Sequence, residues 1–339
     1  MLGGRVVQKL LRPYGACLKL LIVKLSSLGD QLHLCPAVSD LARSLPGAEI
    51  HWLVQKEFAE IPEMHANVLR VITVDFSKRS GVAGRINLIA NLWSTIKTLR
   101  HQHYDVVIDA HGVLKSALLS KMARSKEIVG FASKNTSELG ASFFYNRTLS
   151  VLPGQSATDR NRQLVSFAIN QDLKAYSLCY GLQAPNQHTF KVPTLVIVPG
   201  GSSEKKELPS EFWLNLMDQI RLASFSVLIS WGDERQRNVA KALSDKCGDT
   251  CKPLHQKMSL TDLATYLAGA HGLIGVDSGV THLANALGIP TLVLFTSTRP
   301  ELFFTAGHYK SAFEGGYLRE PDQVAVRNWI SCLTNGAVA

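Results

Sequence analysis

Short apolar runs alternate along this chain with segments whose apolar residues recur at helical spacing. In the first half, the runs predict strands at 20–25, 49–54, 68–74 and 104–110. Helices are expected at 28–45, where Leu34, Val38 and Leu41 share a face, and at 88–99 and 115–122. This order predicts a mostly parallel sheet that is covered by helices on both faces.

The same alternation begins again at residue 194. Strands are expected at 194–198, 226–230, 272–275 and 291–295, and helices at 211–222, 234–243, 260–268 and 281–287. We therefore expect a basic extension (1–17), an N-terminal domain (18–175), a linker (176–193) and a C-terminal domain (194–339). The fold class is α/β, with two Rossmann-like domains facing each other across a cleft, and ligands bind at the carboxyl ends of such strands. The last helix is expected to pack back on the N-terminal domain.

Length and charge refine this picture. A chain of 339 residues suits two domains, and its formal net charge is +9. Residues 1–192 hold 23 Lys and Arg against 13 Asp and Glu, whereas residues 193–339 hold 13 against 14. The N-terminal excess indicates an acidic partner, either anionic lipid, a phosphorylated or carboxylated acceptor, or nucleic acid. The alternative is an ordinary solvated surface.

Several classes of protein are disfavoured. No apolar run reaches the roughly 18–20 residues of a membrane span, and the first residues lack the apolar stretch of a secretory signal. The six cysteines are scattered, so neither a zinc site nor another metal site is expected. Residues 1–17 form either a short amphipathic helix or a frayed end. No aromatic residues are interleaved with the charges at stacking intervals, so nucleic acid is not expected.

The first segment with candidate chemistry is Lys24–His33, where a strand ends in a small turn that bears Asp30. A carboxylate at the carboxyl end of a strand suits a general base. The alternative is that Asp30 only caps the helix that follows.

Three further segments follow strands in the second half. The loop Gly200–Lys206 offers backbone amides, hydroxyls and lysines that suit a diphosphate, or it is a plain polar turn. In Gly275–His282, an Asp-Ser-Gly turn opens a helix whose N-terminus can bind an anion, the alternative being an Asp277 cap with a surface histidine. Trp231–Glu234 presents acids that can accept ribose hydroxyls or cap a helix.

In this order, the motifs resemble those of the ADP-heptose:lipopolysaccharide heptosyltransferases, glycosyltransferase family 9, and most closely the heptosyltransferase I group. The likeness runs from about residue 18 to 304. It rests on VKLSSLGDQLH (23–33), VIDAHGVLKSA (107–117), SFFYNR (142–147), KMSL (257–260) and GVDSGVTHLANAL (275–287). The resemblance implies a GT-B fold and an inverting, metal-independent enzyme.

The resemblance also assigns roles residue by residue. Asp30 matches the catalytic base and Lys206 the lysine that holds the diphosphate. The other positions implied for the nucleotide sugar are Gly29, Ser202, Ser203, Glu234, Met258, Asp277, Ser278, Gly279 and His282. Lys115 and Arg147 match basic residues that face the acidic acceptor. The family often has arginine where this chain has Ser137, and Lys134 can compensate for it.

The implied reaction moves heptose from ADP-heptose to the inner 3-deoxy-D-manno-oct-2-ulosonic acid (Kdo) of Kdo2-lipid A, in the synthesis of the lipopolysaccharide core. The enzyme would need no cofactor and would act as a monomer, peripherally on the cytoplasmic face of the inner membrane. The alternatives are a heptosyltransferase of the same family that adds the second heptose, another GT-B enzyme, or a non-enzymatic basic protein at an anionic membrane surface.

Overall fold

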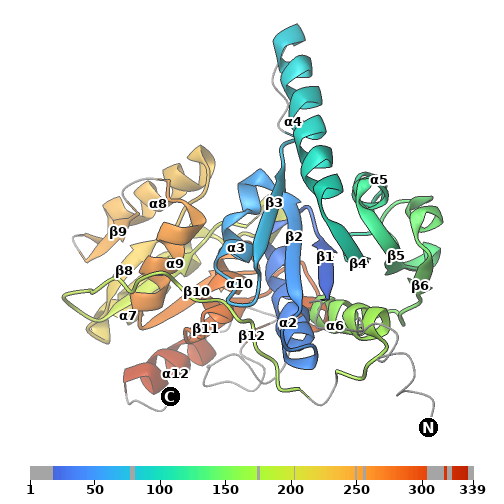
Figure 1. Cartoon of the computed structure of the whole chain (residues 1–339). Helices are drawn as coiled ribbons and strands as arrows, with labels where there is room; N and C mark the ends of the chain where they lie inside the picture. Colours follow the sequence, from blue (N-terminus) through green and yellow to red (C-terminus); the bar gives the residue numbers. More distant parts are fainter. Residues whose placement is uncertain are drawn as a thin grey trace. The chain divides into compact units, whose positions relative to one another are not determined.

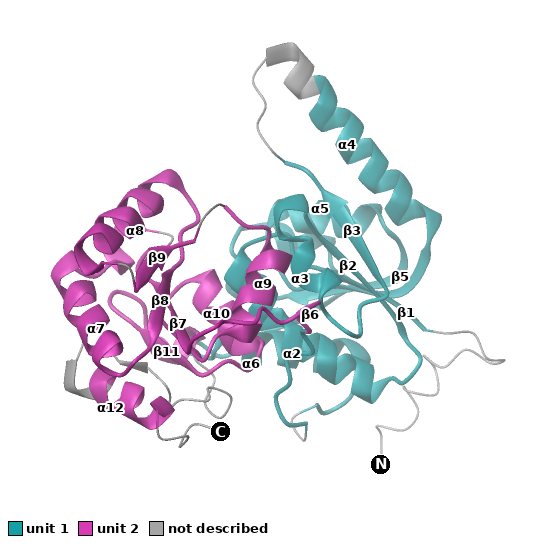
Figure 2. Cartoon of the chain, turned by 90° about the vertical axis from the view of Figure 1, so that its left-hand side faces the viewer, with its two compact units in different colours: residues 1–182 teal, residues 183–339 magenta. Residues whose placement is uncertain are grey.

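The structure is a computed structural model, and it describes residues 18–76, 81–173, 176–201, 203–248, 250–254, 257–303, 317–318 and 323–334. The chain divides into two compact units, residues 1–182 and 183–339 (Figure 2). The division falls inside the segment 176–193 that we expected to link the domains. The extension 1–17 lies outside the described residues.

Unit 1 is built on a parallel six-stranded sheet in the order β3-β2-β1-β4-β5-β6 (Figure 1). Its strands are β1 (Lys19–Val23), β2 (Glu49–Gln55), β3 (Arg70–Val74), β4 (His103–Asp109), β5 (Arg124–Phe131) and β6 (Arg147–Leu149). Its α-helices are α2 (Leu28–Ser44), α3 (Glu60–Glu63), α4 (Gly81–His101), α5 (Leu114–Met122) and α6 (Ala157–Ile169). Short 3-10 helices are η1 (Lys56–Phe58), η2 (Ser133–Asn135) and η3 (Ala141–Phe144).

Helices cover both faces of this sheet because its central strands are apolar on both sides. Leu21 and Val107 pack in one core with Leu99 of α4 and Leu119 of α5. Successive residues of a strand point to opposite faces, so Leu20 and its equivalents on neighbouring strands face α2 and α6, which pack against each other. The apolar runs of the sequence therefore correspond to strands buried from two directions.

Unit 2 repeats the plan with a second parallel sheet, in the order β12-β11-β10-β7-β8-β9. The strands are β7 (Thr194–Val198), β8 (Ser226–Ile229), β9 (Cys251–Pro253), β10 (Gly272–Val276), β11 (Thr291–Leu294) and β12 (Tyr317–Leu318). The helices are α7 (Ser210–Leu222), α8 (Glu234–Cys247), α9 (Leu260–Gly269), α10 (Gly279–Ala286), α11 (Pro300–Phe303), α12 (Gln323–Thr334) and the 3-10 turn η4 (Glu204–Lys206).

The last helix contributes to the core of its own unit. Val326, Trp329 and Ile330 of α12 are buried in the core of unit 2, together with Trp213 of α7. These apolar side chains are covered within unit 2. The expectation that the last helix packs back on the N-terminal domain stays a prediction. No helix in the described part of the chain is both long and apolar enough to span a membrane.

Candidate active site

The candidate base lies where β1 gives way to α2. Ser27 is the N-cap of α2, and Asp30 occupies the third helical position. One carboxylate oxygen, Oδ2, accepts hydrogen bonds from the backbone N–H of Ser27 at 2.8 Å and from its hydroxyl at 3.0 Å. The first of these bonds, from the N-cap N–H to the side chain of the third helical residue, is one half of a capping box. The capping role left open by the sequence is therefore present.

The other carboxylate oxygen of Asp30 faces a lysine. Lys24 Nζ lies 3.5 Å from Oδ1 and also donates to the carbonyl oxygen of Ala110 at 3.0 Å. The Asp30 side chain is 44% exposed, whereas that of Lys24 is only 10% exposed. Partial burial raises the pKa of Asp30, but the charge of Lys24 and the hydrogen bonds from Ser27 outweigh it and leave the pKa below its usual value. The site therefore presents an ionised carboxylate that is partly exposed.

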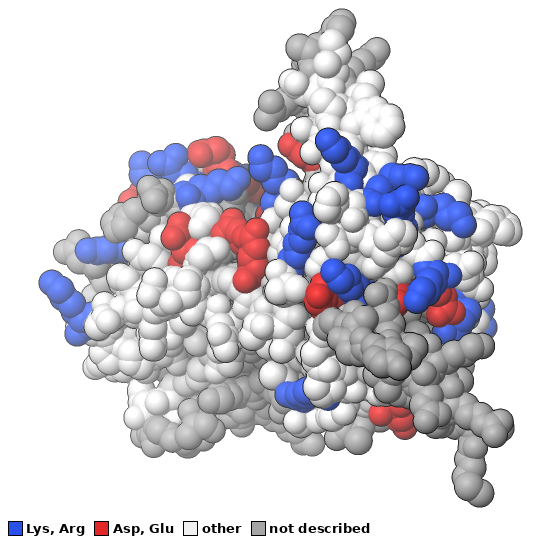
Figure 3. Space-filling model, viewed as in Figure 1, with Lys and Arg blue, Asp and Glu red and all other residues white. Residues whose placement is uncertain are grey.

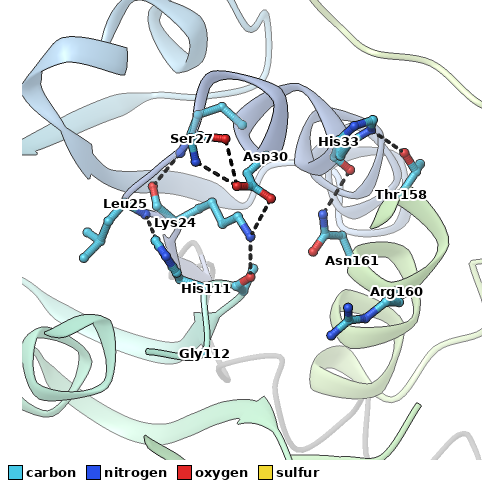
Figure 4. A network of polar contacts seen from close by, with 12 residues as sticks. Lys24, Leu25, Ser27, Asp30, His33, His111, Gly112, Thr158, Arg160 and Asn161 are labelled. Atoms are coloured by element: carbon cyan, nitrogen blue, oxygen red, sulfur yellow. Dashed lines mark hydrogen bonds and ion pairs between the residues drawn. The ribbon is translucent and has the colours of Figure 1, made fainter. Parts of the chain in front are cut away.

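A histidine from the neighbouring strand lines the same site (Figure 4). His111 follows β4, and its Nδ1 accepts a hydrogen bond from the backbone N–H of Leu25 at 2.9 Å. Burial, with a contribution from the charge of Lys24, lowers the pKa of His111 to about 4. At neutral pH the ring is therefore uncharged, with its proton on Nε2.

Buried Asp109 holds this end of β4 in shape. Its carboxylate accepts hydrogen bonds from the backbone N–H of His111 at 2.9 Å, the backbone N–H of Gly112 at 3.2 Å and the hydroxyl of Tyr145 at 2.8 Å. Gly112 has a φ of +74°, in the left-handed region that favours glycine. This network fixes the turn that carries His111.

Helix α6 brings a second cation toward Asp30. Asn161 donates to the backbone oxygen of His33 at 3.1 Å, which ties α6 to α2. Arg160 extends from the N-terminal end of α6, lies over the ring of Phe131 at 5.1 Å and donates to the backbone oxygen of Asn135 at 3.1 Å (Figure 4). Burial lowers the pKa of Arg160, while the charge of Asp30 opposes that shift. Two cations thus accompany the carboxylate in unit 1, a setting suited to an anionic acceptor.

The polar centre of unit 2 is organised by Asp277, which follows β10. Lys206 Nζ donates to its Oδ2 at 2.6 Å, His282 Nε2 lies 2.8 Å from its Oδ1, and the hydroxyl of Thr298 donates to Oδ2 at 2.8 Å. Burial raises the pKa of Asp277, but the bonds and charges of His282 and Lys206 bring it well below its usual value. Asp277 is therefore an anchor for Lys206 and His282.

The N-terminus of α10 lies beside this anchor. Ser278, not Asp277, is its N-cap, and the Ser278 hydroxyl accepts a hydrogen bond from the backbone N–H of Thr281 at 3.3 Å. The first amides of a helix lack intrahelical acceptors and favour anions. A helix terminus and a lysine thus converge on one place, which suits a phosphate group.

Glycine is required where these segments meet. A Cβ on Gly275 would come within 2.7 Å of Thr281 Oγ1 and Val198 Cβ, and one on Gly201 within 2.9 Å of Lys206 Cβ. Contacts that short do not occur in folded proteins. The two glycines therefore allow close packing in unit 2: Gly275 lets α10 approach the sheet, and Gly201 lets the side chain of Lys206 lie against its own loop.

The segment after β8 contacts the Gly201 loop through Gln236. Asp233 caps α8 by accepting from the backbone N–H of Gln236 at 2.8 Å, and Gln236 Nε2 donates to the backbone oxygen of Gly201 at 3.2 Å. Glu234 is largely exposed, with its carboxylate 3.4 Å from Arg237. Of the two acids considered in the sequence, Asp233 is the cap and Glu234 remains accessible.

Comparison with known proteins identifies the family. The sequence model of the family described as "Glycosyltransferase family 9 (heptosyltransferase)" matches residues 92–327. Lipopolysaccharide heptosyltransferase 1 of Pseudomonas aeruginosa is 35% identical over 305 residues, which are 87% of this chain and 82% of that protein. The chain belongs to glycosyltransferase family 9, the heptosyltransferases.

Two solved structures of relatives agree with this heptosyltransferase in fold. Escherichia coli heptosyltransferase WaaC with ADP has a TM-score of 0.79 at 31% identity, covering 95% of this chain and 98% of that one. The same enzyme with ADP-2-deoxy-2-fluoro heptose has a TM-score of 0.74 at 27% identity, covering 94% and 100%. The expected α/β fold of GT-B type, with two parallel-sheet domains, is confirmed, as is the family resemblance.

Most of the predicted nucleotide-sugar residues of the heptosyltransferase lie in unit 2, and several of them meet at Asp277. Asp277, Lys206 and His282 are brought into direct contact, and Ser278 and Gly279 begin α10 beside them. Ser203 is joined to Lys206 through its backbone oxygen at 3.0 Å, whereas Ser202 lies outside the described residues. Glu234 is the first residue of α8, and half-buried Met258 lies in the segment before α9. Gly29 lies beside Asp30 in the first turn of α2 of unit 1.

The predicted acceptor residues are spread over unit 1. Exposed Lys115 lies in the first turn of α5, with its Nζ 5.2 Å from the ring of Phe76, and exposed Lys134 lies in η2 after β5. Arg147 is not grouped with Asp30. Its guanidinium donates to the backbone oxygen of Phe167 and to Asn170 Oδ1, both at 2.8 Å, at the C-terminal end of α6. Arg160, near Asp30, lies at the other end of that helix.

Three polar residues at this site were not singled out in the sequence: Lys24, His111 and Arg160. Lys24 is the first residue after β1 and His111 the second after β4, and the two strands are adjacent, so their position after apolar runs was a usable signal. Arg160 had no such signal, because α6 itself was not predicted.

Among the described residues, no group of three or more His, Cys, Asp and Glu side chains is arranged to hold a metal ion.

Proposed function

We propose that this heptosyltransferase moves heptose from ADP-heptose to the inner Kdo of Kdo2-lipid A. The observation that carries the proposal is the ionised, partly exposed carboxylate of Asp30, with Lys24 at 3.5 Å and with Arg160 of α6 on the same side of unit 1. Its relatives named lipopolysaccharide heptosyltransferase 1 and the ADP-bound structure support the donor and the product.

Asp30 would act as the general base. Its Oδ1 accepts the proton of the attacking acceptor hydroxyl while that oxygen forms a bond to the anomeric carbon of the heptose. The bond from this carbon to the diphosphate oxygen breaks, and ADP leaves with the electron pair. Attack on the face opposite the leaving group inverts the anomeric centre. General-base assistance of this kind contributes roughly 10²–10⁴ in rate.

Unit 2 would bind the nucleotide. Lys206 and the N-terminus of α10 stabilise the negative charge on the departing diphosphate, as fixed charges that need little reorganisation. Glu234 would accept the ribose hydroxyls, and Met258 would line the adenine pocket. We propose that these groups suffice without a metal ion, so transfer is expected to continue in the presence of EDTA.

The acceptor is acidic, and unit 1 offers matching cations. The Kdo carboxylate and the lipid A phosphates would be bound by Arg160 and Lys24 close to Asp30, and by Lys115 and Lys134 at exposed positions. Because this substrate is a lipid, we propose that the enzyme works peripherally at the cytoplasmic face of the inner membrane, and as a monomer.

The decisive experiment incubates the full chain with ADP-heptose and Kdo2-lipid A, with and without EDTA, and follows the lipid by mass spectrometry. One added heptose is expected. If the monoheptosylated lipid is extended instead, the enzyme adds the second heptose, and the acceptor assignment is wrong.

Asp30→Asn tests the base. It should lower kcat by about 10²–10⁴ and leave ADP affinity unchanged. Ser27→Ala is the matched control, since it removes the capping hydroxyl beside Asp30 but keeps the carboxylate. Single-turnover transfer by Asp30→Asn at the wild-type rate would exclude Asp30 as the base.

A further inference from the structure

Helix α4 exposes an apolar surface that the transfer reaction does not explain. Every described side chain from Ile86 to Asn91 is exposed, and the helix extends beyond the rest of unit 1 (Figure 1). Ile86 is 61% exposed, Ile89 59% and Trp93 67%. No other described helix or strand carries as many exposed large apolar side chains. Monomeric proteins rarely leave such a surface uncovered without a binding role.

These side chains form one stripe along the helix. Ile86, Ile89 and Trp93 follow one another at intervals of three or four residues, so they share a face and form the stripe. Lys97 and Arg100 continue this face at the same spacing. The core-facing side of the helix is different: Leu99 is buried, and Leu92 and Ile96 pack against the core of unit 1. The stripe is therefore a second apolar face, separate from the one that attaches α4 to its domain.

Basic residues surround the C-terminal end of the stripe. Lys97, Arg100 and Arg124 line an open hollow of about 780 Å³ next to Trp93. Figure 3 shows Lys and Arg side chains gathered over the lower part of α4, over α5 and over β5. The sequence from 77 to 104 contains five Lys and Arg and no Asp or Glu. Apolar residues with a Trp on the protruding half of a helix, next to Lys and Arg residues at its other end, are typical of a helix that binds the surface of an anionic bilayer.

The position of α4 agrees with a lipid substrate. Asp30 follows β1, and α4 comes after the carboxyl end of β3 in the same parallel sheet. The exposed N-terminal half of α4 therefore extends from the edge of unit 1 that also carries the candidate base. A bilayer at α4 would hold this edge toward lipids whose sugars react there.

We propose that the stripe Ile86–Ile89–Trp93 of α4 inserts into the interfacial region of an anionic lipid bilayer, while Lys97, Arg100 and Arg124 contact its phosphate groups. The proposal deepens the proposed function, because it gives the enzyme a docking device for a membrane-embedded acceptor. It does not depend on which core sugar is the acceptor.

Vesicle binding tests it directly. The full chain is mixed with vesicles that contain phosphatidylglycerol, and with vesicles of phosphatidylcholine alone, and the bound fraction is measured by flotation. Binding is expected only with the anionic vesicles and should weaken with salt. The triple variant Ile86→Ser/Ile89→Ser/Trp93→Ser should lower the partition coefficient about tenfold or more. Leu222→Ser, which alters an 82% exposed leucine of unit 2, is the control and should bind like the wild type.

Tryptophan fluorescence locates the contact. Trp52, Trp213 and Trp329 are buried, and Trp231 is half-buried in unit 2. Quenching by brominated acyl chains should therefore report chiefly on Trp93 and fall sharply in Trp93→Phe. Unchanged vesicle binding by the triple variant would overturn the proposal. So would a wild-type dimer that the triple variant converts to monomers without any vesicle binding, because the stripe would then cover a second copy of the chain.

Activity on two acceptor forms separates this proposal from the proposed function. The triple variant should transfer heptose to a deacylated, soluble acceptor at the wild-type rate but lose rate on the acceptor in vesicles. If the wild type modifies neither acceptor, the proposed function fails while vesicle binding still decides the role of α4.

Discussion

Replacing Lys206 by Met separates its two roles, one in the fold of unit 2 and one in nucleotide binding. The substitution keeps an unbranched side chain of similar length but removes the ammonium group. That group donates to Asp277 Oδ2 at 2.6 Å and to the Asp277 backbone oxygen at 3.3 Å. The Lys206 side chain is 20% exposed and that of Asp277 5%, so the pair is mostly shielded from water.

The expected loss of stability is moderate. Breaking a fully buried ion pair costs about 3–5 kcal/mol. Here Asp277 keeps its bonds to His282 and Thr298, and Lys206 is partly solvated, so we expect about 1–3 kcal/mol. Because the pKa of Asp277 is depressed in the folded state, its stabilising effect is present above the unfolded value near 3.8 and is lost as pH falls through the folded pKa. The difference between wild type and Lys206→Met should therefore shrink in acid.

The effect on the nucleotide is separate. A charge-assisted hydrogen bond to phosphate is worth about 1.5–3 kcal/mol, so the Kd for ADP should rise roughly 10- to 100-fold. Calorimetric titration with ADP measures this, and denaturant unfolding measures stability. Lys205→Met is the matched control, since its exposed side chain lies in the same η4 turn.

A double variant makes the test stricter. Lys206→Met/Asp277→Asn removes the unbalanced carboxylate and should recover much of the lost stability, but not the affinity for ADP. If Lys206→Met bound ADP as tightly as wild type, or if Lys205→Met lost as much affinity, the diphosphate role of Lys206 would be refuted.

Three further changes have defined outcomes. Lys24→Met removes the charge that lowers the pKa of Asp30, so the acid limb of the pH profile of kcat/KM should move to higher pH, and an unmoved limb would contradict the pairing. Arg160→Met should raise the KM for the acidic acceptor about tenfold while leaving ADP affinity unchanged, as steady-state kinetics and calorimetry would show. Gly275→Ala should destabilise unit 2 by about 1–3 kcal/mol in denaturant unfolding, because its Cβ would press on Val198; an unchanged midpoint would mean that the sheet yields there.

The elements that could be predicted from the sequence are those whose apolar residues face a core. β7 was predicted at the residues where it occurs, and β4 within one residue at each end, because both are apolar on two faces. β5 begins with the charged sequence RSKE and becomes buried only from Ile128, so its first half gives no strand signal. In α6, the buried face carries the polar residues Thr158 and Asn161 in its first half, so the apolar helix signal begins only at Leu164.

Of the candidate site, the residues that directly follow apolar strands or begin the next helix could be predicted from the sequence, and their neighbours could not. Asp30 and Asp277 each follow an apolar strand, where a parallel sheet collects its functional groups. Their surroundings were not predictable. Thr298 bonds to Asp277 from a loop, and Arg160 is brought to the same part of unit 1 as Asp30 by a helix far away in the sequence. The sequence left open whether Asp30 and Asp277 only cap helices, and only the geometry answers this. Asp30 accepts a hydrogen bond at the start of α2 and is still partly exposed. At α10 the N-cap is Ser278 and not Asp277.

The two hydrogen bonds that Ser27 donates to Asp30 have an entropic consequence. Its Oδ2 is held by Ser27 at the start of α2, a helix buried continuously from Gln31 to Leu41. The carboxylate thus loses little rotational freedom when an acceptor arrives, a saving of about 0.5–1 kcal/mol per immobilised side chain. Its lone pairs keep one direction in the frame of unit 1, so the incoming hydroxyl must align itself to the base. Selectivity among acceptors can then arise from which sugar presents a hydroxyl along that fixed line.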